Sequence, residues 1–188
     1  MTELWLIRHG QTEWNVSGRL QGQTDIPLNE TGLAQARELA AQLRQREFRA
    51  LYSSDLQRAA QTARVISEAL HLEVQLHRGL REICFGEWEG QIPAEIRQRY
   101  PEIIAAGRLH PLDTPYPGGE TDREVAQRVA AAADEIAQDH PSGSVLVVSH
   151  GRALAILTCL ACGYPLETIN QHGLGNALPR VVEWRNQR

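Results

Sequence analysis

The stretch Leu4-Trp5-Leu6-Ile7-Arg8-His9-Gly10 decides the fold class, together with its counterpart Val145-Leu146-Val147-Val148-Ser149-His150-Gly151. Each stretch is a short apolar run that ends in a histidine followed by a glycine. Runs of this length and β-branched content are typical of buried strands in a parallel sheet. Ligands of open α/β sheets bind at the carboxyl ends of the strands, so we expect both histidines at one functional edge. Because Arg8 precedes one His-Gly pair and Arg152 follows the other, the pattern indicates a site for an anion.

Outward from these two runs, helical and extended patterns alternate along the chain. Apolar residues at helical spacing predict amphipathic helices over about 31–45, 54–69, 121–138 and 152–162. Further short strands are expected over 50–52, 73–77 and 180–184. The motifs Ser54-x-x-Gln57 and Thr121-x-x-Glu124 match capping boxes and predict two helix starts. This alternation predicts a single three-layer α/β/α domain over residues 1–188, with a mainly parallel sheet.

Two segments have no regular pattern. Residues 10–29 form a polar connection that is long for a structureless loop, which indicates a functional role. Residues 79–117 are the least regular part of the chain, with short helices expected at about 93–100 and 101–107. We expect this second segment to form a lid, and the part from residue 91 onward to determine substrate specificity.

The composition of the 188-residue chain excludes several function classes. Its net charge is −4, so neither a general nucleic-acid surface nor a membrane-binding surface is indicated. All 19 basic residues are arginines, which rules out Schiff-base chemistry on lysine and a phosphate loop that depends on lysine. Arginine does offer a planar fork that holds phosphate with two hydrogen bonds.

The sequence gives no indication of export or of membrane insertion. The start, Met1-Thr2-Glu3, leads directly into a strand without a basic and long apolar leader. The longest apolar stretch, 153–162, is too short to cross a bilayer. Cys159 and Cys162 lie late in an expected helix without a second cysteine pair, so we interpret them as buried apolar residues. These features predict a cytoplasmic protein.

Leu6–Asn15 resembles the signature of the histidine phosphatase superfamily, the phosphoglycerate-mutase-like proteins. Further matching blocks follow in the family's order and extend over nearly the whole chain: Gly18–Gly22, Asp25–Gly32, Ser53–Ala63, Leu80–Ile83, Gly86–Gly90, Pro117–Thr121 and Val148–Gly151. An Arg-His-Gly triplet alone is a weak signal, but this ordered set is highly specific. The chain most resembles the phosphatase branch, which includes alpha-ribazole phosphatases and broad-specificity phosphatases.

The resemblance implies a role for each matching residue. His9 is implied as the nucleophile that forms a phosphohistidine, and Glu82 as the proton donor to the leaving group. Arg8, Arg58 and His150 are implied to hold the phosphoryl oxygens. Further substrate contacts are implied for Asn15, Gln21, Gly22 and Gly151. The family needs no metal ion for this chemistry, so no metal site and no cofactor are expected.

General chemistry supports these roles independently. Phosphoryl transfer needs positioning and charge stabilisation, which arginine forks and a further imidazole donor supply. A neutral imidazole is a better nucleophile than water, and nearby arginines disfavour the protonated ring of His9. One carboxyl group, Glu82, is able to act first as an acid and then as a base. Other residues are interpreted as structural, in that they hold or order loops beside the site: Gly86, Glu89, Gly90 and Glu120.

Three functions remain open at this point. The first is a phosphomonoesterase that hydrolyses a small phosphorylated metabolite through a phosphohistidine intermediate. The second is a cofactor-dependent phosphoglycerate mutase, which requires 2,3-bisphosphoglycerate. The third is a catalytically dead protein that binds a phosphorylated ligand. A homodimer also remains open, whereas nucleic-acid and membrane partners are not expected.

The sequence favours the first of these functions. Mutases of the family carry an Arg and a Tyr after the acidic residue, but here Glu82 is followed by Ile83-Cys84-Phe85. The segment 91–143 is also shorter than expected for a mutase. The dead-protein alternative is disfavoured because every position that the mechanism requires is filled.

Overall fold

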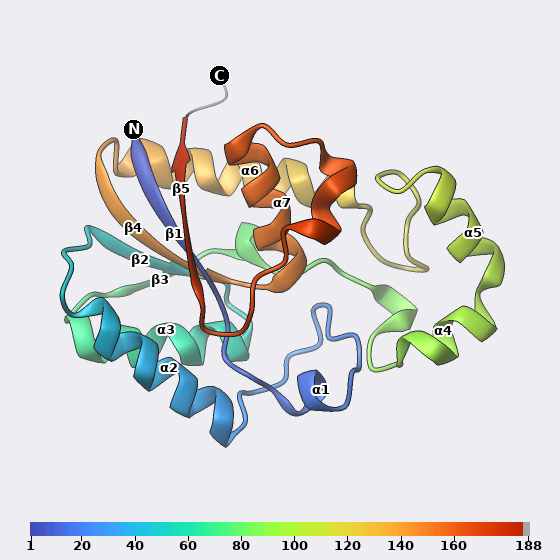
Figure 1. The fold of residues 1–188 in the computed structure, drawn as a ribbon, viewed down its shortest axis with the longest axis horizontal. Helices are drawn as coiled ribbons and strands as arrows, with labels where there is room; N and C mark the ends of the chain where they lie inside the picture. Colours follow the sequence, from blue (N-terminus) through green and yellow to red (C-terminus); the bar gives the residue numbers. More distant parts are fainter. Residues whose placement is uncertain (186–188) are drawn as a thin grey trace.

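The central sheet of the computed structural model, which describes residues 1–185, has five strands in the order β3-β2-β4-β1-β5 (Figure 1). The strands are β1 (Thr2–Arg8), β2 (Ala50–Ser53), β3 (Val74–Leu76), β4 (Gly143–Ser149) and β5 (Pro179–Trp184). β5 runs antiparallel to β1, and the other pairings in this part of the chain are parallel. The expected mainly parallel sheet is confirmed.

Two long helices cover each face of the sheet in the described part of the chain (Figure 1). The pair on one face is α2 (Glu30–Leu43) and α3 (Gln57–Leu70). The pair on the other face is α6 (Asp122–Asp139) and α7 (Gly151–Cys162). The three-layer α/β/α architecture is therefore confirmed. That one domain extends over all of 1–188 stays a prediction, because its last three residues lie outside the described part.

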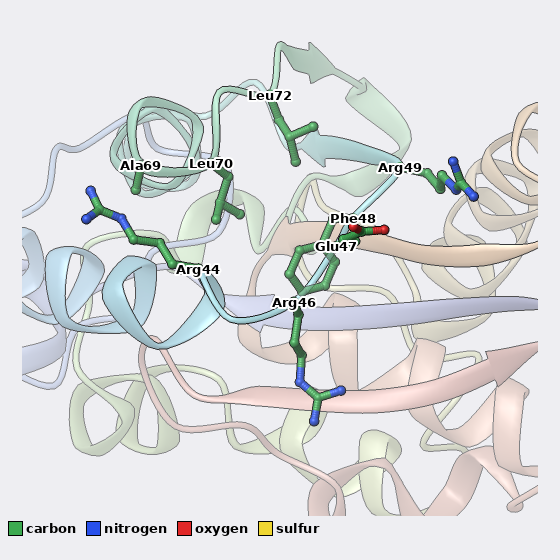
Figure 2. A pocket seen from close by; sticks show the side chains of 8 residues that line it. All are labelled: Arg44, Arg46, Glu47, Phe48, Arg49, Ala69, Leu70 and Leu72. Carbon is green, nitrogen blue, oxygen red and sulfur yellow. The ribbon is translucent and has the colours of Figure 1, made fainter.

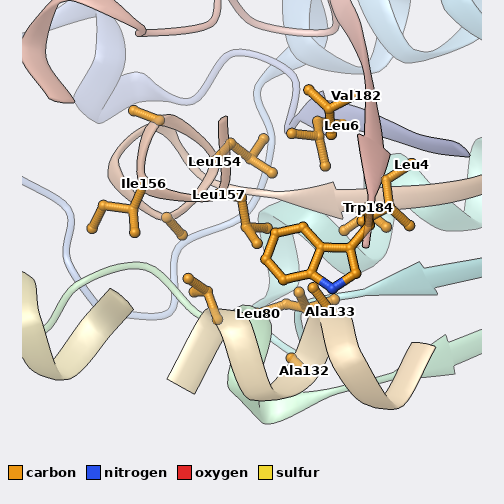
Figure 3. Close-up of a cluster of buried hydrophobic side chains, with 14 of the residues drawn as sticks. Leu4, Leu6, Leu80, Ala132, Ala133, Leu154, Ile156, Leu157, Val182 and Trp184 are labelled. Atoms are coloured by element: carbon orange, nitrogen blue, oxygen red, sulfur yellow. The ribbon is translucent and has the colours of Figure 1, made fainter. Parts of the chain in front are cut away.

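The alternation of side chains along β1 divides the core into two layers. Leu4 and Leu6 pack in the cluster on the α6–α7 face, and Trp5 and Ile7 pack in the cluster on the α2–α3 face. Figure 3 shows the first cluster, in which the buried indole of Trp184 lies among aliphatic side chains of the sheet and both helices. Burial on both faces explains the continuous apolar runs in the central strands.

The two irregular segments contain short helices. α1 (Glu13–Val16) lies in the connection after β1, and α4 (Pro93–Arg99) and α5 (Pro101–Leu109) occupy nearly the expected positions. In Figure 1, α4 and α5 stand at the far side of the molecule from the strands. Three short 3₁₀ helices were not expected: η1 (Arg78–Leu80), η2 (Gly86–Trp88) and η3 (Leu166–Gln171). Such short elements carry too few residues for a periodic signal.

The two predicted capping boxes have different outcomes. The box at α6 is confirmed, because the Thr121 hydroxyl accepts from the Glu124 amide and the Glu124 carboxylate accepts from the Thr121 amide. The box at α3 is wrong, because Ser54 lies too early and accepts from the amide of Leu56. A carboxylate from a distant loop caps α3 in its place, as described below. No helix within residues 1–185 is both long enough and apolar enough to span a bilayer.

Candidate active site

The sheet register brings the two predicted histidines together. β1 pairs with β4 so that Arg8 lies opposite Ser149, and the next residues, His9 and His150, leave the sheet side by side. The amide of His9 donates to the carbonyl of Ser149 over 3.0 Å. The two imidazole rings are 5.3 Å apart between centroids, and both are buried. The parallel pairing of two distant strands therefore builds the edge that the sequence predicted.

The hydrogen bond of His9 fixes its reactive nitrogen. Nδ1 lies 2.7 Å from the carbonyl oxygen of Gly10, and because a carbonyl only accepts, Nδ1 must carry the hydrogen. Burial first, and then the charges of Arg58 and Arg8, hold the pKa of His9 well below its usual value. The ring is therefore neutral near pH 7, with an unprotonated Nε2. This tautomer is the one that a nucleophilic imidazole requires.

Two arginines lie beside His9, Arg58 fully buried and Arg8 half-buried. Arg58, at the start of α3, is fully buried and donates to the carbonyls of Thr24 and Gly22 over 2.9 and 2.6 Å. Burial lowers the pKa of Arg58 to about 10, so its guanidinium remains charged at pH 7. Arg8 donates to the carbonyl of Leu174, and burial also lowers its pKa. The two guanidiniums are thus anchored by backbone carbonyls.

Unpaired polar atoms gather at these same residues. Within residues 1–185, the buried atoms without a hydrogen-bond partner include Nε of Arg8, Nε of Arg58, both ring nitrogens of His150 and Oε1 of Gln21. Buried polar groups are rarely left unpaired in proteins, because each costs about 1–3 kcal/mol. An anion with several oxygens would satisfy the donors in this set. The site is therefore suited to a tetrahedral oxyanion.

Glu82 reaches the site from an irregular segment between η1 and η2. Its Oε1 accepts from the amides of Ile83 and Ala153 over 3.0 and 3.1 Å, and its Oε2 accepts from the amide of Arg152 over 3.1 Å. Two of these donors belong to the first turn of α7, where free amides favour a carboxylate. The carboxyl group is thereby fixed near Arg8 and Arg58, with 9% of the residue exposed.

Arg128 of α6 holds the segment that carries Glu82, a role that the sequence analysis missed. Its guanidinium donates to the carbonyls of Gly79, Arg81 and Glu82 over 2.7–3.1 Å. It also pairs with Glu120, which in turn accepts from the amide of Cys84. Glu120 therefore orders this loop, as expected. Nothing in the helical pattern distinguished Arg128 from arginines that face solvent.

Asn176 is a second residue that sequence reasoning missed. Its side-chain amide donates to the carbonyl of His9 over 2.7 Å, and it lies 3.4 Å from Oδ1 of Asn15. The same Oδ1 accepts from the amide of Thr12, so Asn15 caps the short helix α1 beside His9. The segment before β5 thus supports the carboxyl end of β1. No local motif could have indicated Asn176.

The two glycines named from the sequence differ in whether a side chain would fit. A Cβ on Gly22, which has a φ of +51°, would meet the carboxylate of Glu89 at 2.0 Å. Glu89 accepts from the amide of Phe85 and from the neighbouring Gln21–Thr24 turn, so it joins two loops of the site. A Cβ on Gly151 would lie 3.6 Å from Arg8 and 3.7 Å from Glu82. Both positions therefore border the proposed anion site.

Other candidate features lie away from this centre. A cavity lined by Arg44, Arg46 and Arg49 lies where β2 begins, at the edge of the sheet opposite to His9 and His150. The three arginines point in different directions (Figure 2). Cys159 is buried as expected, but Cys162 is exposed, because the end of α7 leaves the core; the interpretation of Cys162 as buried was wrong. Residues 1–185 contain no group of three or more metal-ligating side chains placed to hold a metal ion.

Comparison with known proteins places the chain in a family. The family model described as histidine phosphatase superfamily (branch 1) matches residues 4–188. The chain belongs to the histidine phosphatase superfamily. This membership confirms the resemblance found in the sequence.

Several proteins are similar over the full length of the chain. The uncharacterized phosphatase PhoE of Bacillus subtilis is 37% identical, with 100% of this chain and 91% of that protein covered. The metal-independent phosphoserine phosphatase of Arabidopsis thaliana is 40% identical, with 100% and 79% covered. The probable phosphoglycerate mutase GpmB of Proteus mirabilis is 34% identical, with 99% and 86% covered. Relatives named phosphatases agree with the expected enzyme class.

Solved structures of the superfamily have the same fold. The putative alpha-ribazole-5'-P phosphatase from Escherichia coli superposes with a TM-score of 0.88 at 29% identity, with 96% of this chain and 89% of that chain covered. A phosphoserine phosphatase mutant from Entamoeba histolytica, solved in complex with phosphoserine, superposes with a TM-score of 0.86 at 32% identity, with 98% and 92% covered. The architecture derived above is therefore that of the superfamily.

Proposed function

We propose that this chain is a phosphomonoesterase that hydrolyses a small phosphorylated metabolite through a phosphohistidine at His9. One observation carries the proposal. The Nδ1–H of His9 is bound to Gly10, which leaves Nε2 as a free lone pair. The surrounding guanidiniums of Arg8 and Arg58 and the ring of His150 have buried atoms without partners.

In the first step, Nε2 of His9 attacks phosphorus and the bond from phosphorus to the ester oxygen breaks. Glu82 gives its proton to that oxygen, so the alcohol leaves as a neutral molecule. In the second step, water attacks the phosphohistidine and passes a proton to Glu82. Inorganic phosphate leaves, and His9 and Glu82 return to their starting forms.

In this proposal, side chains of the protein alone balance the negative charge of the transferring phosphoryl group. Arg8, Arg58 and His150 donate to the three equatorial oxygens of the transferring group, where negative charge is spread. Asn15, Gln21, Gly22 and Gly151 border the same space. The reaction therefore needs no metal ion and no organic cofactor, in agreement with the name of the metal-independent relative.

The proposal also concerns the alcohol half of the substrate. One relative is named a phosphoserine phosphatase and another a probable phosphoglycerate mutase, so phosphate esters of small hydroxy acids are the first substrates to test. The mutase alternative has a named relative in its support, but Ile83-Cys84-Phe85 supplies neither the charge nor the hydroxyl that mutases use after the acidic residue. Cytoplasmic location remains a prediction, which cell fractionation would test, and a homodimer remains open to a test by light scattering.

Trapping the intermediate tests this function. Rapid quenching with labelled substrate in the presence of EDTA should yield an acid-labile phosphoenzyme, and His9→Ala should form none and lose nearly all turnover. Parallel assays should show phosphate release, and no isomerisation of phosphoglycerate when 2,3-bisphosphoglycerate is added. A phosphoenzyme that persists in His9→Ala contradicts the proposal, and isomerisation without phosphate release favours the mutase.

A further inference from the structure

Arg152 is a third guanidinium beside the site, and the proposed phosphoryl transfer does not use it. The sequence places it directly after His150-Gly151, and its backbone amide binds the carboxylate of Glu82 over 3.1 Å. Glu82 is the group proposed to protonate the departing alcohol. The backbone of Arg152 therefore contacts the residue that is proposed to face the alcohol half of the substrate.

The side chain of Arg152 is held in one orientation. Its Nε and Nη2 donate to the two carboxylate oxygens of Asp122, whose side chain is only 2% exposed. Its Nη1 donates to Oδ1 of Asn170 over 2.6 Å. These bonds use three of the five N–H groups of a guanidinium, so one N–H remains on each terminal nitrogen. The side chain of Arg152 is half-buried, with 22% of it exposed, so solvent reaches part of it.

Arg152 shares a cavity with Arg8, one of the two arginines beside His9. Arg152 and Arg8 line the same cavity of about 180 Å³, whose other walls include Gly151, Asn170 and Leu174. A Cβ added to Gly151 would lie in ordinary van der Waals contact with Arg8 and Glu82, at 3.6 and 3.7 Å, so this wall of the cavity adjoins both residues. A ligand whose phosphate is bound by Arg8 thus has room for a second polar group next to Arg152.

We propose that Arg152 binds a carboxylate carried by the alcohol half of the substrate, on the carbon beside the ester-bearing carbon. The two remaining donors match the two oxygens of a carboxylate, and charge-assisted bonds of this kind are about twice as strong as neutral ones. The inference rests on the proposed phosphatase function and assigns its substrate class, the phosphate esters of hydroxy acids.

Matched substrate pairs test this assignment. Phosphoserine and phosphoethanolamine differ only by the carboxylate, and 3-phosphoglycerate and glycerol 3-phosphate differ by a carboxylate in place of a hydroxymethyl group. The unmodified enzyme should favour the carboxylate member of each pair by about 10- to 100-fold in kcat/KM, the range expected for hydrogen bonds to a charged group. Equal kcat/KM within each pair overturns the inference, and this measurement depends on no variant.

Arg152→Gln should abolish the preference through a higher KM for phosphoserine. Its kcat/KM for phosphoethanolamine and for p-nitrophenyl phosphate should fall by a smaller factor than its kcat/KM for phosphoserine, so the ratio within the pair measures the lost carboxylate contact. Arg152→Lys keeps the charge without the fork and should retain only part of the preference. Arg123→Gln, which removes an exposed ion pair with Asp113 at the start of the same helix α6, is the matched control and should change neither ratio.

The outcomes separate this inference from the function on which it rests. Equal losses with both members of a pair in Arg152→Gln would mean that Arg152 only joins α6 to α7 through Asp122, which overturns the carboxylate assignment. Turnover of p-nitrophenyl phosphate without any preference refutes the inference and leaves the phosphatase function intact. Absence of turnover and of phosphohistidine with every ester refutes the function, and the inference with it.

Discussion

At the scale of single residues, the position of Glu82 depends on groups outside its own loop. Three backbone amides bind its carboxylate, and two of them belong to α7. Arg128 fixes the carbonyl of the same residue. A proton donor must be held within hydrogen-bond reach of the leaving oxygen, and this arrangement provides that rigidity without a regular element. Its role in proton transfer remains a proposal.

The first prediction at this scale separates proton donation by Glu82 from phosphate binding. A carboxyl group that protonates an alkoxide matters most for poor leaving groups, and general acid catalysis contributes about 10²- to 10⁴-fold. We expect Glu82→Gln to slow phosphohistidine formation from alkyl phosphates by about that factor. The first step with p-nitrophenyl phosphate, measured as a burst of p-nitrophenolate, should suffer much less. Equal losses for both substrates would show that Glu82 positions the phosphate and does not donate a proton.

At the scale of elements, a loop carboxylate determines the start of α3. Asp25 accepts from the backbone amide of Gln57 over 2.6 Å and from its side chain over 3.1 Å. Gln57 immediately precedes Arg58, so this cap also fixes where the buried guanidinium enters the site. Asp25 lies 32 residues before Gln57 in the chain, and a local motif search could only find the nearer serine.

We therefore expect Asp25→Ala to have two effects. Loss of the cap should cost about 0.5–2 kcal/mol of unfolding free energy, measured by urea denaturation. It should also weaken competitive inhibition by phosphate or vanadate, because Arg58 loses its support. Thr121→Ala removes the cap of α6 and serves as the control: its stability should fall by a similar amount while inhibition by phosphate stays unchanged. Unchanged inhibition in Asp25→Ala as well would show that the cap serves stability alone.

At the scale of the whole molecule, the fold buries two imidazoles among positive charges. Burial and the neighbouring Arg58 hold the pKa of His150 well below its usual value, as they do for His9. The unfolded chain binds protons at these histidines below about pH 6.5, whereas the folded chain does not. Stability therefore rises with pH up to about 6.5 and falls as the pH drops below it.

The size of this effect gives a measurable prediction. Each buried histidine should contribute a slope of up to about 1.4 kcal/mol per pH unit below pH 6.5. The double variant His9→Gln/His150→Gln should therefore lose less stability between about pH 6.5 and 5 than the parent, as measured by urea denaturation across that range. If the unfolding free energies of the two proteins changed with pH in parallel, the histidines would not be neutral in the folded state.

The sequence by itself determined the features that have a local period or an ordered motif. Alternation and helical spacing predicted the sheet and the four long helices, because each residue's burial follows from its place in a repeating pattern. The paired Arg-His-Gly and His-Gly-Arg stretches predicted the edge at which His9 and His150 meet. The ordered motifs identified the superfamily and named the candidate residues of the proposed anion site.

Only the tertiary structure decided how those residues are held. Four sets of contacts join positions 32 to 167 residues apart. Amides of α7 bind Glu82, Arg128 donates to the carbonyl of Glu82, Asn176 donates to the carbonyl of His9, and Asp25 caps α3. The reason is physical: a side chain on a loop or helix surface has no pattern of its own that states which distant backbone group it will meet. That partner exists only after packing on both faces of the sheet has brought the loops at its carboxyl edge together.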